Sequence, residues 1–132
     1  MYPERVVKAL QRARAHLQAG NAELALPELE KSVQKSPKGF EAWFLLGQAR
    51  GILNQHAQAE TCLKKAAIFN PKNADLWFNL GICYSAREMF TEAIPCYEKS
   101  IQYADRIKVE AYHNLGSCLL SMAVLTRDTA NL

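Results

Sequence analysis

The chain has 132 residues, 49% of them hydrophobic, and a formal net charge of +3, which fits one domain of ordinary composition. Its 16 Lys and Arg residues are interleaved with 13 Asp and Glu residues rather than gathered into a patch, so no nucleic-acid-binding surface is expected. No run of about 18 apolar residues exists, so no membrane span is expected either. Charged side chains interrupt the N-terminal segment, which lacks the apolar core of a signal peptide, and we expect a cytoplasmic protein.

Helical signals follow one another along the chain without any strand pattern. Apolar residues recur three and four positions apart, which is typical of one face of a helix. Turn signals separate these stretches at Gly20-Asn21, where Asn21 is a candidate cap, and at Ser36-Pro37 and Asn70-Pro71, where proline ends a helix. The predicted helices lie near residues 4–18, 22–35, 39–52, 56–69, 73–86, 90–103 and 107–123. The fold class is therefore all-α.

A five-residue pattern occurs three times. Trp43-Phe44-Leu45-Leu46-Gly47 returns 34 residues later, starting at Trp77, and again 35 residues after that, starting at Tyr112. Self-similarity at this period is typical of a stacked helical array. The repeats cover residues 6–39, 40–73 and 74–108, and a partial fourth covers 109–132.

These blocks resemble the tetratricopeptide repeat (TPR), a helix–turn–helix unit of about 34 residues. The second and third blocks carry its motif at Trp43, Leu46, Gly47, Ala59 and Pro71, and at Trp77, Leu80, Gly81, Tyr84 and Ala93. The first block is degenerate, with Ala9 in the aromatic position and Ala13 in the glycine position. The resemblance implies a single array over residues 1–132, a solenoid of about seven antiparallel helices in a right-handed stack.

Glycine recurs in the middle of three predicted helices, at Gly47, Gly81 and Gly116. A glycine there costs about 1 kcal/mol relative to alanine. Its return at one register indicates a close approach between helices, with Ala59 and Ala93 as the expected small partners.

The resemblance also places a binding site, because the first helix of each TPR lines a concave groove. The expected groove residues are Glu41, Phe44, Gln48, Asp75, Phe78, Asn79, Ile82, Glu110, His113 and Asn114. Phe44 and Phe78 are expected to be exposed aromatic anchors for a peptide or helix. Asn79 and Asn114 match the inner asparagines that bind peptide main chain in the O-GlcNAc transferase superhelix, although an asparagine can equally serve as a polar surface residue.

Charge narrows the expected ligand. Glu41, Asp75 and Glu110 share one register of the repeat and form an acidic row, which favours a basic and apolar peptide. The clamp with which TPR co-chaperones hold acidic C-termini consists of two lysines, an arginine and two asparagines. Only Asn79 fits at the corresponding positions, so that function is not expected.

The four cysteines fall on repeat registers, Cys62 with Cys96 and Cys83 with Cys118. We expect them to be buried and reduced, because free cysteine packs as a small hydrophobe. Neither a Cys/His spacing typical of zinc nor a catalytic motif such as GxGxxG, GxSxG or HExxH occurs. Accordingly we expect no catalytic residues, no metal, no cofactor and no enzyme activity.

The fourth block stops after its first helix. Tyr112, Leu115, Leu119 and Met122 continue the packing strip, while the chain after Ala123 is too short for a second helix of about 13 residues. A second copy, a longer array or the tail folding back would cover this strip. We expect self-association through these residues, as an isologous homodimer through the C-terminal helix.

The expected function is a protein-interaction scaffold that binds a peptide segment or partner helix in the groove. Two alternatives stay open: a substrate-positioning TPR arm of a larger enzyme, such as a glycosyltransferase- or sulfotransferase-linked protein, and a self-assembly module. RNA binding is a weaker alternative, because Phe and Asn on an inner face can also contact bases.

Overall fold

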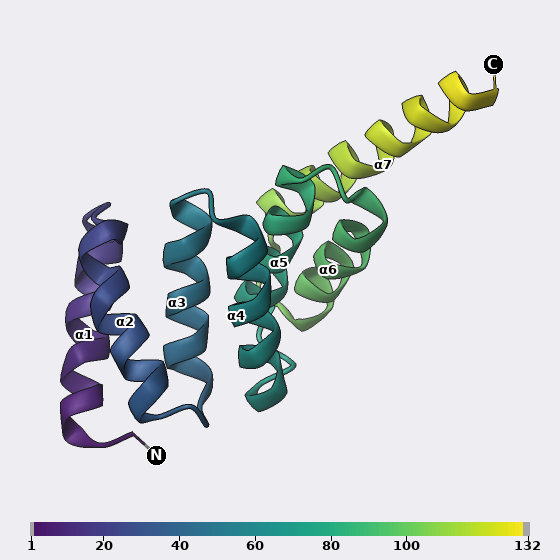
Figure 1. Ribbon diagram of the computed structural model, residues 1–132. Coiled ribbons are helices and arrows are strands. Elements are labelled where there is room, and N and C mark those ends of the chain that lie inside the picture. The colour runs from purple at the N-terminus through teal and green to yellow at the C-terminus, as the bar shows by residue number, and fades with distance from the viewer. Residues whose placement is uncertain (1, 131–132) are drawn as a thin grey trace. The chain divides into compact units, whose positions relative to one another are not determined.

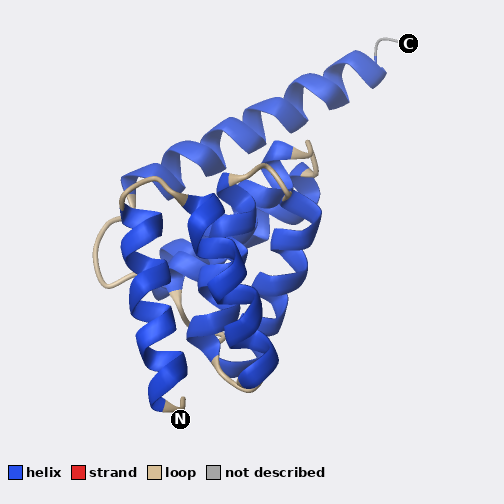
Figure 2. Ribbon diagram, turned by 60° about the vertical axis from the view of Figure 1, so that its left-hand side comes forward, coloured by secondary structure: helices blue, strands red, loops and turns tan. Residues whose placement is uncertain are grey.

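The computed structural model describes residues 2–130, which are helical apart from short connections (Figure 2). The helices are α1 (Glu4–Gln18), α2 (Ala22–Lys35), α3 (Phe40–Ile52), α4 (His56–Phe69), α5 (Ala74–Ala86), α6 (Phe90–Tyr103) and α7 (Val109–Ala130). No strand occurs among the described residues. The all-α helical-repeat prediction is confirmed, and the first six predicted helices agree with the structure to within one residue at each end.

The chain divides into two compact units, residues 1–71 and residues 72–132. The N-terminal unit contains α1 to α4, and the C-terminal unit contains α5 to α7 (Figure 1). Within the first unit, each helix packs on the next, and α1 also reaches α3. Within the second unit, α6 packs on both α5 and α7. A single right-handed array over residues 1–132 stays a prediction.

Small and branched apolar side chains fill the core of each unit. In the N-terminal unit, Leu10, Leu29 and Leu46 belong to one buried cluster, and the repeat alanines Ala25 and Ala59 are fully buried. Each such leucine contributes about 1.5–3 kcal/mol through burial. The apolar positions of the repeat thus form the hairpin interfaces that the periodicity predicts.

Two of the three mid-helix glycines lie where helices approach closely. A Cβ atom built on Gly47 would lie 2.6 Å from Cγ of Leu63, and one built on Gly81 would lie 2.6 Å from Cε1 of Tyr97. The close approach is confirmed, and the backbone oxygen of Ala59 lies 3.5 Å from the Cβ built on Gly47, but the nearest atoms at both glycines belong to the larger side chains of Leu63 and Tyr97. In each antiparallel hairpin, the residue facing the glycine lies four positions after the alanine, and its large side chain fills the gap that the missing Cβ leaves.

Helix starts use different caps. The backbone N–H of Leu76 donates a hydrogen bond to Asn73 Oδ1 (3.0 Å), which satisfies a free donor in the first turn of α5. Asn21 does stand at the start of α2, but its side chain makes no cap hydrogen bond. Gly20, just before it, has a φ of +82°, a conformation that favours glycine.

Helix α7 is longer than predicted. It continues to Ala130, so the prediction of an end near residue 123 was wrong. The chain after Gly116 contains neither glycine nor proline, so no residue there stops a helix. The alternative of a tail that folds back is also wrong as far as Ala130. None of the helices in residues 2–130 combines the length and apolar character needed to cross a membrane.

Candidate peptide-binding hollow and helix face

A hollow of about 350 Å³ lies on the C-terminal unit, where α5, α6 and α7 meet. Its lining consists of Ile82, Ser85, Ala86, Phe90, Tyr97, Asn114, Ser117, Cys118 and Ser121. None of these side chains carries a formal charge at neutral pH. The hollow offers hydroxyl, amide and apolar groups, a set that suits an uncharged ligand segment.

A short polar chain forms part of the lining. The hydroxyl groups of Ser85 and Tyr97 share a hydrogen bond of 2.9 Å, and Ser85 Oγ also lies 3.3 Å from Cys118 Sγ. Burial raises the pKa of the Tyr97 phenol, although its hydrogen bond with Ser85 partly opposes this shift. Tyr97 therefore keeps its proton at neutral pH, and the lining stays uncharged.

Two of the expected groove residues, Ile82 and Asn114, line this hollow together. Ile82 is 37% exposed and offers an apolar surface, while the amide of Asn114 can both donate and accept a hydrogen bond. Phe78 does not line it. Instead, Phe78 packs edge-to-face on Tyr97 with ring centroids 6.0 Å apart, and it is half-buried. The expectation that Phe78 is an exposed anchor was therefore wrong.

The remaining expected groove residues of this unit lie outside the hollow. Asn79 is half-buried on α5, and Glu110 and His113 are exposed near the start of α7. Asp75 is exposed but forms an ion pair with Lys108, with Nζ and Oδ1 2.7 Å apart. This pairing reduces the negative charge that the expected acidic row would present.

The N-terminal unit positions its expected groove residues differently. Glu41 forms an ion pair with Arg14 of α1, so its charge is also compensated. Phe44 stacks on Phe40 with centroids 5.0 Å apart and an interplanar angle of 17°. Phe44 and Gln48 are both half-buried, and the expectation of an exposed Phe44 was wrong because the neighbouring turn of α3 supplies a second ring.

Matches to protein-family models identify the type of repeat. Three tetratricopeptide repeat models match residues 10–50, 40–73 and 74–105. The chain belongs to the tetratricopeptide repeat family. No curated protein sequence matches it.

Solved TPR structures are similar to this chain over most of its length. MamA is 25% identical with a TM-score of 0.83, and the match covers 89% of this chain and 68% of MamA. The Sgt2 TPR domain from Aspergillus fumigatus is 16% identical with a TM-score of 0.85, covering 96% and 84%. The first TPR of Spaghetti (RPAP3), solved with the HSP90 peptide SRMEEVD, is 17% identical with a TM-score of 0.84, covering 93% and 99%.

The TPR motif tryptophans lie in a contact that the sequence interpretation missed. Lys65 Nζ sits 4.5 Å from the ring centroid of Trp43, and Lys99 Nζ sits 4.2 Å from that of Trp77. Each lysine comes from the second helix of the same repeat, and the two are 34 residues apart. Their recurrence at the repeat period was a signal in the sequence that could have revealed these cation–π pairs.

Lining residues of the hollow outside the expected groove were missed for a related reason. Phe90 and Tyr97 come from a second helix of a TPR, which the family pattern does not assign to the groove. Cys118 was interpreted as a packing residue only. All four cysteines are free and buried, as expected, and burial raises the pKa of Cys62. Among residues 2–130, no cluster of three His, Cys, Asp or Glu side chains is arranged to hold a metal ion.

The expected self-association residues of α7 are unequal in exposure. Tyr112 is 52% exposed and Leu119 is 51% exposed, whereas Leu115 and Met122 are half-buried. Gly116 differs from the two earlier TPR glycines, because a Cβ built on it would have no described atom within 4 Å. Within the C-terminal unit, the position beside Gly116 that a large side chain fills in the earlier repeats is therefore open.

Proposed function

We propose that this TPR protein is an interaction scaffold whose C-terminal unit binds a peptide segment in the hollow between α5 and α7. The observation that carries the proposal is the uncharged lining, with the Asn114 amide beside the apolar side chain of Ile82. A peptide needs both kinds of contact, since side-chain burial provides affinity and a donor–acceptor amide can pair with the main chain. The similar RPAP3 domain, solved with a peptide, supports this use of the fold.

The same lining defines the ligand chemistry. An uncharged hollow gives no ion pair to an aspartate, glutamate or C-terminal carboxylate, whose desolvation would then cost several kcal/mol. An internal peptide segment with an apolar or small neutral side chain is favoured over an acidic terminus. Glu41 and Asp75 already form ion pairs with Arg14 and Lys108. Basic residues in the ligand should therefore add less to the binding affinity than the acidic row alone would suggest.

Selection from a library of random displayed peptides tests this assignment. We expect the wild-type chain to enrich neutral, apolar segments and Ser121→Trp to lose them, because the indole would occupy the hollow. Gln102→Trp, on an exposed position of α6 outside the lining, is the matched control and should bind as wild type does. Equal binding by Ser121→Trp, with a circular dichroism spectrum like that of wild type, would show that the hollow is not the site.

A second comparison isolates the amide. Asn114→Ala should weaken every selected peptide about tenfold, as expected for a lost hydrogen bond to an otherwise buried group. His113→Ala changes the exposed neighbouring residue, which does not line the hollow, and should leave affinity unchanged. Similar losses in both variants would argue against recognition of the main chain by Asn114.

A second function, self-association through α7, is favoured by one specific observation. Gly116 and the exposed Tyr112 and Leu119 belong to a TPR packing face that no other helix of the C-terminal unit covers at Gly116. The substrate-positioning arm of a larger enzyme remains a prediction from the family resemblance.

A cytoplasmic location is supported by the four buried free thiols, since reducing compartments maintain cysteines in that form.

A further inference from the structure

Four residues of α7 form an exposed stripe, which we call the α7 stripe: Tyr112, Gly116, Leu119 and Ala123. Their spacing of four, three and four positions places them on one face of the helix. The face that packs on the rest of the unit is a different one, where Ala111 and Cys118 are buried. The stripe is therefore a second apolar face of a helix whose first face is already occupied.

Charge is absent along this part of the helix. Residues 111–126 contain no Asp, Glu, Lys or Arg. A helix face exposed to solvent usually carries charged and polar residues. An uncharged stripe can meet an identical stripe without like-charge repulsion, and this makes a second copy an acceptable partner.

In the two earlier repeats, a large side chain packs against the glycine at this register. The side chain of Leu63 packs against Gly47 and the side chain of Tyr97 packs against Gly81, and each comes from an antiparallel helix. The dispersion contacts of a large side chain fill the gap left by the missing Cβ. Gly116 leaves the same gap and has no described side chain in it.

We propose that the α7 stripe pairs with the α7 stripe of a second copy, antiparallel and about a two-fold axis. This arrangement rests on the self-association proposed above. Residue size alternates along the stripe as large, small, large, small, and its 4–3–4 spacing reads the same in both directions. Reversal of the partner helix therefore sets each Leu119 against the other copy's Gly116 and each Tyr112 against the other copy's Ala123.

Other arrangements of two copies fit less well. A parallel, in-register pair would set tyrosine against tyrosine and glycine against glycine, which leaves the gap at Gly116 empty. A head-to-tail contact with another surface would not close and would generate open chains. The antiparallel pair fills both gaps and leaves neither stripe free.

Oligomeric state is the first test. Sedimentation velocity on the 132-residue chain should show a dimer at high micromolar concentration. Gly116→Gln should raise the dimer dissociation constant about tenfold or more, because the glutamine side chain would fill the space in which Leu119 of the second copy packs. Its melting temperature at low concentration should not fall, since the space beyond Gly116 is open and glutamine favours helix.

The matched control is Glu110→Gln, which introduces the same side chain on another exposed face of α7 and should dimerise as wild type does. A wild-type chain that remains monomeric overturns the proposal and leaves a different protein's helix, or the other unit of this chain, as the cover for the stripe. A dimer that is insensitive to Gly116→Gln also overturns it, because the contact then lies elsewhere.

Cross-linking tests the register. In the proposed pair, residue 112 of one copy faces residue 123 of the other, so a mixture of Tyr112→Cys and Ala123→Cys should form an intermolecular disulfide. Neither variant alone should do so, because two identical positions would lie 11 residues apart, about 16 Å along the axis, whereas disulfide Cα atoms lie about 5.5–6 Å apart. Each variant mixed with wild type controls for the native cysteines, which are all buried.

The two measurements separate the possible failures. A dimer by sedimentation with no disulfide in the mixture overturns the antiparallel register while self-association stands. A disulfide within either single variant points to a different register and has the same consequence. Loss of peptide binding has no bearing on either result, since the hollow and the stripe use different faces of α7.

Discussion

Helices α5 and α7 begin with the same TPR pattern but complete it differently. In α5, Leu80 is 2% exposed, Tyr84 is 7% exposed and Tyr97 of α6 fills the gap beside Gly81. In α7, the residue at the register of Tyr84 is Leu119, which is 51% exposed, and the gap beside Gly116 is open. The TPR pattern therefore predicts a helix face that can pack against a second helix, but it does not determine whether a helix packs there.

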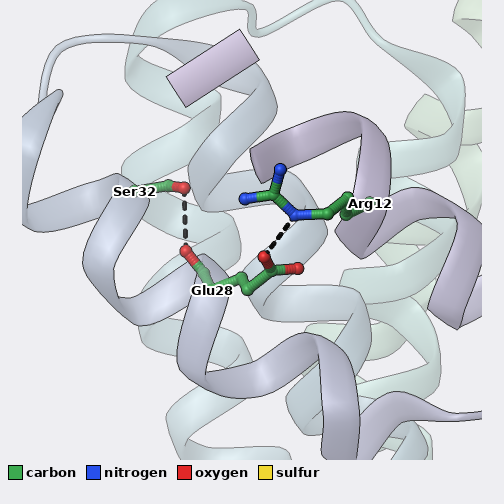
Figure 3. A network of polar contacts seen from close by, with 3 residues as sticks. All are labelled: Arg12, Glu28 and Ser32. Atoms are coloured by element: carbon green, nitrogen blue, oxygen red, sulfur yellow. Dashed lines mark hydrogen bonds and ion pairs between the residues drawn. The ribbon is translucent and has the colours of Figure 1, made fainter. Parts of the chain in front are cut away.

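Helix α1 packs on α2 and carries a charged residue at one register of this pattern. Arg12 stands at the register of Leu46, and its Nε donates a hydrogen bond to Glu28 Oε1 of α2 at 2.6 Å (Figure 3). The hydroxyl of Ser32 donates to the backbone oxygen of Glu28 at 2.8 Å. At these two registers α1 carries Arg12, whose side chain is 58% exposed, and Ala13, which is fully buried, whereas α7 carries the half-buried Leu115 and the exposed Gly116.

Removal of the side chain that fills the Gly81 gap should have the largest effect. Tyr97 is 1% exposed and contacts Phe78 and Ser85. Tyr97→Ala should lower the free energy of unfolding by about 3–5 kcal/mol, as for other buried aromatic truncations. Urea unfolding measures this change, and Leu119→Ala in α7 is the comparison, with an expected loss below about 1 kcal/mol in the monomer. Similar losses would remove the distinction between the filled and the open face.

The paired phenylalanines should behave as partly structural residues. Phe44 and Phe78 are half-buried and contact other rings, so each change to alanine should cost about 1–2 kcal/mol, less than a fully buried aromatic. Thermal and urea unfolding of the single variants gives these values. A loss in the free energy of unfolding below about 0.5 kcal/mol would show that these ring contacts add little to stability and would favour a role for both rings as groove anchors.

Alkaline pH should weaken the filled hairpins in particular. Burial raises the pKa of Cys62 above its ordinary 9.0 and that of Tyr97 above its ordinary 10.0, so both groups bind their protons more tightly when folded. The unfolded chain loses these protons first, and stability should fall as pH rises from about 9 upward. Tyr97→Phe should flatten the part of this slope above pH 10, and an unchanged slope would contradict the assignment.

The exposed ion pair between Asp75 and Lys108 should contribute least. Asp75→Asn should change stability by less than about 1 kcal/mol, since the aspartate side chain is 60% exposed and solvent screens the pair. A larger loss, measured by urea unfolding at low and high salt, would show that this contact organises the start of α7.

The sequence predicted the bounds of the first six helices well, because turn residues and the repeat period both mark helix ends. Periodicity does not determine which residue faces Gly81 across the hairpin, so alanine was expected where Tyr97 lies. Nor does it reveal that Phe40 lies beside Phe44 or Tyr97 beside Phe78, and both phenylalanines therefore looked exposed. Those contacts depend on the rotation and offset of neighbouring helices.

The site was only partly predictable for the same reason. Ile82 and Asn114 were assigned from the first helices of repeats, whereas Phe90 and Tyr97 reach the hollow from α6. The end of α7 was misplaced because the repeat pattern predicted a turn where the local sequence contains no residue that stops a helix.

The most direct measurement of the central contrast is the free energy of unfolding of Gly81→Ala and Gly116→Ala, at protein concentrations low enough to exclude dimers. A Cβ at Gly81 would overlap the Tyr97 ring, so Gly81→Ala should lose about 1–3 kcal/mol. A Cβ at Gly116 meets open space, so Gly116→Ala should gain about 0.5–1 kcal/mol from helix propensity. Opposite signs are the predicted result. A loss at Gly116 comparable to that at Gly81 would contradict the account, because it would mean that a side chain already fills this face of α7.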